Sequence, residues 1–171
     1  MRALLIFLIL LFPATLSALE IKSSGFSGGK AIPSQYTCDS SDISPGLSWS
    51  DAPPGTKSFA LICEDPDSSA KPWSHWVIFN IPAEKTGLPE DMPKRAVLGD
   101  GATQGINDFG QIGYRGPCPP PGKAHRYFFK LYALDAKIPL DQNAAKERVI
   151  QAIKGRVLAQ AEIFGTYSRR Q

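Results

Sequence analysis

The pattern of apolar and polar positions predicts a chain built mainly from short β-strands. Residues 57–64 and 75–81 are short apolar runs bounded by Pro and Asp, which is typical of buried strands rather than helices. In the stretch HRYFFKLYALD, every second residue falls on one face, because side chains along a strand alternate with a period of two. His125 and Tyr127 are therefore expected to share a face.

One helix and a last strand complete the pattern. Residues 141–154 carry apolar side chains at helical spacing, with Asp141 as the expected N-cap and Gly155 as the stop. The stretch RVLAQAEIFG then returns to alternation and predicts a strand. Strands dominate and do not alternate with helices, so we expect a mainly β fold, a sandwich of antiparallel sheets with one or two peripheral helices.

Length and composition favour a single domain with elaborate loops. The chain has 171 residues, of which 43% are hydrophobic, and this is enough for one core but not for two. Fifteen prolines and fifteen glycines without a repeat fit many turns between short strands. Two irregular segments, residues 25–48 and 83–113, are long for a compact domain, and such loops are usually functional.

The first 18 residues have the layout of a secretory signal peptide. Arg2 gives a positive start, residues 3–12 are continuously apolar, and the segment ends in small residues near Ser17 and Ala18. We therefore expect residues 1–18 to be removed and residues 19–171 to form the domain of a periplasmic or secreted protein; an uncleaved anchor is the alternative. Loss of Arg2 lowers the formal net charge of +3 by one, and so weak a charge predicts no nucleic-acid binding.

Export changes how the three cysteines are interpreted, because an even subset is expected to pair in an oxidising compartment. Cys63 lies in the apolar run SFALICED and resembles a buried thiol. Cys38 and Cys118 lie in loop-like sequence rich in Pro, Gly and Ser, so we predict a disulfide between them. A bridge between Cys38 and Cys63, or three free thiols, stay as alternatives.

Costly polar groups gather where the predicted strands begin and end. In CEDPDSSAKPWSHW, Asp65 and Asp67 end one strand and His75 begins the next, so Asp65 and His75 are expected to lie close together. His125 also begins a strand, after a Pro- and Gly-rich loop. A carboxylate that accepts from one imidazole nitrogen would leave the other nitrogen to donate to a negative group. Two such histidines beside the Tyr127 hydroxyl predict a small anion site.

Simpler interpretations of the same residues exist. Asp and Pro at residues 65–67 are common turn formers, and a histidine at a strand start is often only a satisfied polar end. Trp73 and Trp76 are large apolar side chains that usually belong to a core. The PCPPP run could be a ligand for an SH3-type domain, although the flanking glycines and the following strand favour a rigid loop.

Two stretches together carry a family resemblance: CEDPDSSAKPWSHWVIFNIP and GYRGPCPPPGKAHRYFFKLYALD resemble the signature regions of the phosphatidylethanolamine-binding protein family, and specifically its bacterial Raf-kinase-inhibitor-like branch. SPGLSWSDAPPGTKSFAL and GRVLAQAEIFGTY are also similar to that branch. The resemblance implies a large antiparallel sheet, a smaller sheet and a pocket for phosphate or a phospholipid head group.

The resemblance also assigns roles to single residues. It implies that Asp65 holds a pocket histidine and that Asp67 is a structural partner of its loop. The implied pocket residues are Asp65, Trp73, His75, Pro120, Gly122, His125 and Tyr127. The family often has a proline soon after the second aspartate, where this chain has Ser68 and Ser69.

The leading functional hypothesis is an exported binding protein without catalytic activity, cofactor or metal, whose partner is a small anion such as phosphate, phosphoethanolamine or a carboxylate. No nucleic-acid partner and no stable membrane span are expected. The main alternative is inhibition of a kinase or protease through the loop at residues 83–113. An enzyme using His125 with Cys118 or a water, and a zinc site of Asp65, His75 and His125, are further alternatives.

Overall fold

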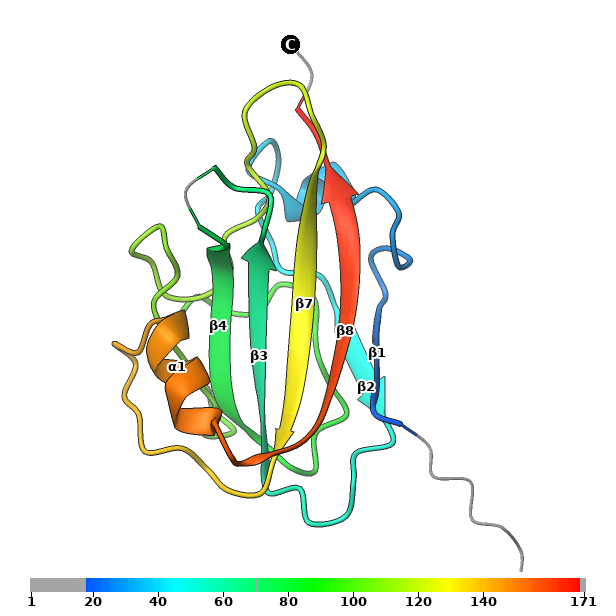
Figure 1. The fold of residues 1–171 in the computed structure, drawn as a ribbon. Coiled ribbons are helices and arrows are strands. Elements are labelled where there is room, and N and C mark those ends of the chain that lie inside the picture. The colour runs from blue at the N-terminus through cyan, green and yellow to red at the C-terminus, as the bar shows by residue number, and fades with distance from the viewer. Residues whose placement is uncertain (1–17, 70, 170–171) are drawn as a thin grey trace, which may run out of the picture.

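Two antiparallel sheets and one α-helix make up the described part of the chain, residues 18–69 and 71–169, in this computed structural model (Figure 1). The larger sheet has the order β6 (Thr103–Gln104), β4 (Trp73–Pro82), β3 (Ser58–Asp65), β7 (His125–Leu134) and β8 (Val157–Tyr167). The smaller sheet has the order β1 (Glu20–Ser23), β2 (Leu47–Ser50) and β5 (Gly87–Leu88). The prediction of a mainly β fold with a large and a small antiparallel sheet is confirmed.

Strand β3 lies in the middle of the large sheet and is covered on both faces. On one face, Phe59 and Leu61 join the core that the small sheet closes. On the other, Ala60 and Ile62 belong to a second core with Val149 of helix α1 (Lys146–Ile153). Burial on both faces explains why β3 is a continuous apolar run instead of an alternating one.

Strand β7 follows the alternation that its sequence predicts. Tyr127, Phe129 and Leu131 are fully buried, whereas Phe128 on the outer face stacks on Phe164 of β8 with ring centroids 4.9 Å apart. The buried face continues to His125 at the start of the strand, so His125 and Tyr127 do share a face.

The structure corrects the start of the helix and the content of the long segments. Helix α1 begins at Lys146 with Ala145 at its N-cap, and not at Asp141. Asp141 instead accepts a hydrogen bond from the Asn143 amide at 2.9 Å, because a short acidic side chain readily closes a turn on its own backbone. The two irregular segments contain the short β5 and β6, the start of β2, and the 3-10 helix η1 (Ser34–Tyr36).

A disulfide joins Cys38 to Cys118, as predicted, and Cys63 is a buried free thiol. Burial raises the pKa of the Cys63 thiol well above its usual value, so it stays neutral. The predicted signal peptide lies almost wholly outside the described residues, which begin at Ala18. Among the described residues, none of the helices has the length and apolar character that crossing a membrane requires.

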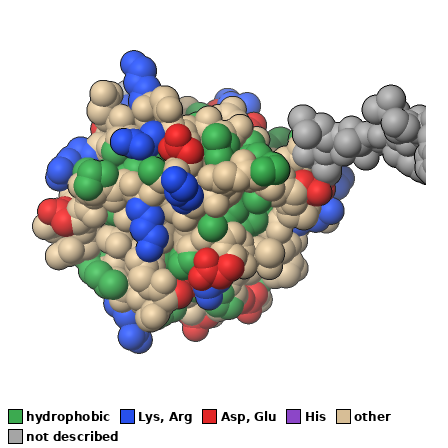
Figure 2. All heavy atoms as spheres, turned by 90° about the horizontal axis from the view of Figure 1, so that it is seen from below, with side chains coloured by type: hydrophobic (Ala, Val, Ile, Leu, Met, Phe, Trp, Pro, Cys, Tyr) green, Lys and Arg blue, Asp and Glu red, His purple; other side chains and the backbone are tan. Residues whose placement is uncertain are grey.

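The end of the molecule that faces away from the Asp65 end of β3 is shown in Figure 2. Basic and acidic side chains are scattered there among apolar and other residues. Neither sign of charge gathers on this face, in keeping with the weak net charge of the chain.

Gly105 is a position where the fold leaves no room for a side chain. A Cβ atom there would overlap the carbonyl oxygen of Ala144. Gly105→Ala is therefore expected to lower the free energy of unfolding by about 2 kcal/mol or more, as overpacking does. Urea denaturation measures this, with Gly99→Ala as the control because nothing lies within 4 Å of a Cβ at Gly99. Equal stability of the two variants would contradict the packing described here.

Candidate functional site

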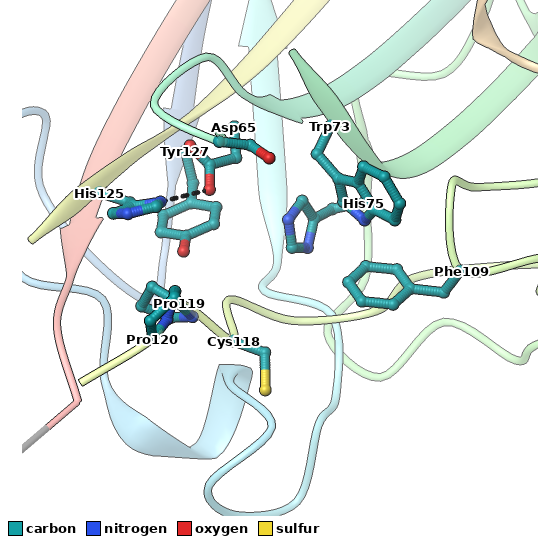
Figure 3. Close-up of a pocket in the computed structure, with 10 residues that line it drawn as sticks. Asp65, Trp73, His75, Phe109, Cys118, Pro119, Pro120, His125 and Tyr127 are labelled. Carbon is teal, nitrogen blue, oxygen red and sulfur yellow. Dashed lines mark hydrogen bonds and ion pairs between the residues drawn. The ribbon is translucent and has the colours of Figure 1, made fainter. Parts of the chain in front are cut away.

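A cavity of about 230 Å³ lies at the end of the large sheet, where β3 ends and β4 and β7 begin (Figure 3). These ends meet because neighbouring strands run antiparallel. The lining consists of Asp65, Ser68, Trp73, His75, Phe109, Cys118, Pro119, Pro120, His125 and Tyr127.

Asp65 is 4% exposed and pairs with His125. Its Oδ2 accepts a hydrogen bond from His125 Nδ1 at 2.7 Å, and its Oδ1 accepts one from the Asp67 amide at 2.8 Å. Asp65 and His75 line the same cavity, as their places at the strand ends predict, and the pocket histidine that Asp65 holds is His125. β3 and β4 pair with Asp65 opposite Trp73. His75 lies further along β4 and finds a different acceptor.

That acceptor is the backbone of Arg115. His75 is 2% exposed, and its Nδ1 donates to the Arg115 carbonyl oxygen at 2.7 Å, since a carbonyl can only accept. The Arg115 amide donates in turn to the His75 carbonyl at 2.9 Å. Burial lowers the pKa of His75 below its ordinary value, although the Arg115 carbonyl and the charge of Asp65 act in the opposite direction. His75 is therefore neutral at neutral pH.

These contacts fix which ring nitrogen faces the protein in both histidines. In each ring Nδ1–H donates a hydrogen bond to a protein oxygen. The acceptor is Asp65 Oδ2 for His125 and the Arg115 carbonyl for His75. A neutral imidazole has a single N–H, so Nε2 then holds a lone pair and accepts. Nε2 therefore accepts in a neutral ring and donates only in a ring that takes up a second proton.

The Tyr127 hydroxyl lacks a hydrogen-bond partner among the described residues and is buried. Its oxygen lies on the side of the ring nearer the loop of Pro119 and Pro120 (Figure 3), and the Asp65 carboxylate is close enough to act on its pKa. The Tyr127 ring lies edge-on to the His75 ring, with centroids 5.1 Å apart. Burial and the negative charge of Asp65 raise the pKa of Tyr127 far above its usual value, so this hydroxyl keeps its proton and can donate.

Aromatic rings form the wall beside His75. Phe109 packs edge-on against Trp73 and His75, with centroid distances of 5.7 and 5.2 Å, and it is 37% exposed. Asn107 shapes this loop, because its Oδ1 accepts hydrogen bonds from the amides of Phe109 and Gln111. Sequence reasoning missed Phe109, and the Asn in INDFGQ was the local turn signal that pointed to an ordered loop.

Some of the other residues predicted for the pocket line the cavity, and others lie outside its lining. Pro120 lines the cavity, as do Pro119, Cys118 and Ser68, none of which was predicted to line it. Gly122 does not belong to the lining. Its φ is 122°, and its amide donates a hydrogen bond to the Arg169 carbonyl, which places it in the following turn. Trp76 is a core residue whose Nε1 donates to Gln104 at 2.7 Å.

Asp67 lies outside the cavity lining and holds the start of β7. It accepts hydrogen bonds from the backbone amide, Nε and Nη2 of Arg126 at 2.7 to 2.9 Å. These contacts hold the pKa of Asp67 far below its usual value. Asp67 therefore fixes the strand residue next to His125.

A second carboxylate braces the opposite wall. Asp42 accepts from the Gly116 amide at 2.7 Å and from Arg115 Nη1 at 3.0 Å, and Lys94 also contacts it at 3.0 Å. The nearby disulfide ties Cys38 to the cavity residue Cys118. The Arg115 carbonyl that orients His75 thus belongs to a segment that the Asp42 carboxylate and the disulfide hold in place.

The geometry bears on two alternatives from the sequence. Across residues 18–69 and 71–169, no three His, Cys, Asp or Glu side chains gather as a metal site would require. Cys118 is oxidised, so its sulfur is not a free nucleophile in this form.

A family model and several known proteins are similar to this chain over most of its length. The model of the family described as phosphatidylethanolamine-binding protein matches residues 22–168. A UPF0098 protein of Methanothermobacter thermautotrophicus is 53% identical over 151 residues, which cover 88% of this chain and 99% of that protein. A UPF0098 protein of Aquifex aeolicus is 47% identical over 161 residues, covering 93% of this chain and 94% of that protein.

Two crystal structures are similar throughout the domain. A putative phosphatidylethanolamine-binding protein homolog, CT736 from Chlamydia trachomatis, is 39% identical with a TM-score of 0.81, covering 89% of this chain and 98% of that one. YbcL of E. coli, presented as a new member of the mammalian family, is 38% identical with a TM-score of 0.84, covering 90% and 100%. This chain belongs to the phosphatidylethanolamine-binding protein family.

The disulfide should contribute strongly to stability. Replacing both Cys38 and Cys118 with Ser is expected to lower the free energy of unfolding by about 3 to 5 kcal/mol, because the bridge restricts the unfolded chain over a long loop. The two residues are 80 apart in the sequence. Guanidinium denaturation measures the loss, and a reducing agent should bring the wild type to the same value. Unchanged stability would refute this role of the bridge.

The depressed pKa of His75 predicts a pH dependence of folding. The unfolded state takes up a proton on this ring near pH 6.5, whereas the folded state resists it. The stabilising contribution is complete above that pH and is lost as the pH falls through the folded-state pKa. The stability difference between wild type and His75→Asn should therefore shrink from pH 7.5 to pH 5 in phosphate-free buffer. A constant or growing difference in denaturant titrations would contradict the burial argument.

Proposed function

We propose that this protein is an exported member of its family that binds a small oxyanion, phosphate or a phosphate ester, in the cavity at the end of β3, β4 and β7, without catalysing a reaction. The Tyr127 hydroxyl is the observation that carries the proposal. It is a buried donor without a partner in the described part of the chain, and Tyr127 lines the same cavity as Asp65, His75 and His125. A buried hydroxyl without a partner costs free energy, and such groups usually have a functional reason.

The two histidines support the same ligand class. Asp65 holds Nδ1 of His125, which leaves Nε2 as the ring nitrogen for a guest. An imidazolium at this position would donate Nε2–H to the anion. Tyr127 would supply the second donor. The guest's charge would then face the imidazolium, which lies between it and Asp65.

Export is part of the proposal and rests on the first 18 residues of the sequence. The disulfide between Cys38 and Cys118 is compatible with an oxidising compartment such as the periplasm or the cell exterior. Inhibition of a kinase or protease is the alternative, and it has one observation in its favour. Val97 and Phe109, on the long segment at residues 83–113, are exposed large apolar side chains.

Tyr127→Phe tests the proposed site directly. The variant is expected to bind phosphate roughly tenfold more weakly, since one donated hydrogen bond is lost. Its stability without phosphate should be unchanged or slightly higher, because the buried hydroxyl has no partner to lose. Isothermal titration calorimetry with inorganic phosphate and with phosphoethanolamine measures both affinities.

Tyr132→Phe is the matched control, because Tyr132 lies on β7 but on the face that packs with the second core. It should bind phosphate like the wild type. If Tyr127→Phe also binds phosphate like the wild type, the cavity is not the anion site.

A further inference from the structure

We infer that the cavity selects an oxyanion that carries a proton, such as hydrogen phosphate or a phosphate monoester, over an oxyanion or a phosphodiester that has no O–H to donate. The inference rests on the proposed function and adds the hydrogen-bond character of the guest. It depends on the His75 ring, which lines the cavity and whose Nδ1 donates to the Arg115 carbonyl, so that Nε2 is left as an acceptor in the neutral ring.

The orientation of the His75 ring is fixed by its neighbours. The Arg115 carbonyl holds Nδ1–H at 2.7 Å, and the Arg115 amide holds the His75 carbonyl at 2.9 Å. Asp42 anchors this segment through the Gly116 amide and the Arg115 guanidinium. A Cβ on Gly116 would overlap the backbone of residues 36–37, so the segment is also packed tightly. The ring therefore cannot present Nδ1 to the cavity without breaking these contacts.

A second proton on His75 is disfavoured at neutral pH. The ring is buried, with Phe109 and Tyr127 edge-on to it. The charged groups that act on it are Asp65 and Asp42, and both favour the imidazolium, but burial outweighs them and lowers the pKa of His75. Nε2 of His75 is therefore an acceptor at neutral pH.

The site offers a guest one hydrogen-bond acceptor and two donors. Tyr127 and protonated His125 would each donate to an anionic oxygen, while His75 Nε2 requires an O–H from the guest. Hydrogen phosphate and a singly protonated monoester have such a group, whereas sulfate and a phosphodiester have none at neutral pH. An oxygen lone pair facing the Nε2 lone pair in a buried site is repulsive, and a site built for a hydrogen bond rejects analogues that cannot make it.

This distinguishes the two sources of the phosphate group named in the proposed function. Inorganic phosphate carries an O–H at neutral pH, and a monoester such as phosphoethanolamine supplies one in its singly protonated form, since its second pKa is about 6. The head group of an intact phospholipid is a diester and supplies none. The cavity is therefore expected to take the soluble ligand in preference to the lipid.

Calorimetry of the full domain at pH 7.0 in a phosphate-free buffer tests the inference. The probes are inorganic phosphate, sulfate, phosphoethanolamine and dimethyl phosphate. Phosphate is expected to bind at least about tenfold more tightly than sulfate and dimethyl phosphate. Lowering the pH toward 5 should strengthen sulfate relative to phosphate, because a protonated His75 becomes a donor.

His75→Gln is the informative variant, since its amide can turn an N–H toward the guest. It should bind sulfate and phosphate with similar affinity, whereas Tyr127→Phe should weaken both anions by the same factor. The comparison of phosphate with sulfate binding uses the wild type alone, so the test stands even if His75→Gln misfolds. Equal or tighter binding of sulfate by the wild type at pH 7.0 overturns the inference and leaves the proposed function standing. Binding of none of the four probes overturns the proposed function itself.

Discussion

The hydrogen bond between Asp65 and His125 is the interaction on which the site depends. Asp65 is a carboxylate with almost no exposure at the end of the central strand, and a buried charge is tolerated only with partners. Its two oxygens are used for different purposes: one orients the His125 ring from β7, and the other holds the Asp67 amide in the loop after β3. Asp67 then fixes Arg126, the neighbour of His125. One buried carboxylate thereby joins the strand ends that surround the cavity.

The other face of the sheet supports the same strand end. Glu64, next to Asp65, accepts hydrogen bonds from Lys130 at 2.7 Å and from Lys146 at 3.0 Å. Lys146, the first residue of α1, also donates to the Pro72 carbonyl at 2.6 Å. Pro72 directly precedes the cavity residue Trp73 on β4. The helix thus connects through one ammonium group to both strands that bound the loop, and this arrangement pre-organises the site.

Much of this arrangement follows from sequence pattern. The continuous apolar run of β3, the alternation along β7 and the loop character around Cys38 and Cys118 are local signals, and each predicts what the structure shows. The convergence of Asp65 and His125 could also be expected, because polar groups at the ends of antiparallel neighbours meet at one edge of a sheet.

What could not be predicted depends on contacts between distant segments. Which of the two histidines pairs with Asp65 depends on the registers of β3 with β4 and with β7, which no local pattern specifies. The acceptor role of His75 comes from a backbone carbonyl 40 residues away. Phe109 reaches the cavity through the path of a long loop, and α1 begins later than its apolar spacing indicates because Asp141 closes a turn instead.

The most direct test of this account is the protonation of the two imidazole rings, read by long-range proton–nitrogen NMR of the histidines with and without phosphate. In the free protein Nδ1 should carry a proton in both rings, and Nε2 of His75 should be unprotonated at neutral pH. Phosphate should shift the Nε2 resonances of both rings. A proton on Nε2 instead of Nδ1 in His75, or Nε2 resonances that do not respond to saturating phosphate, would contradict this account.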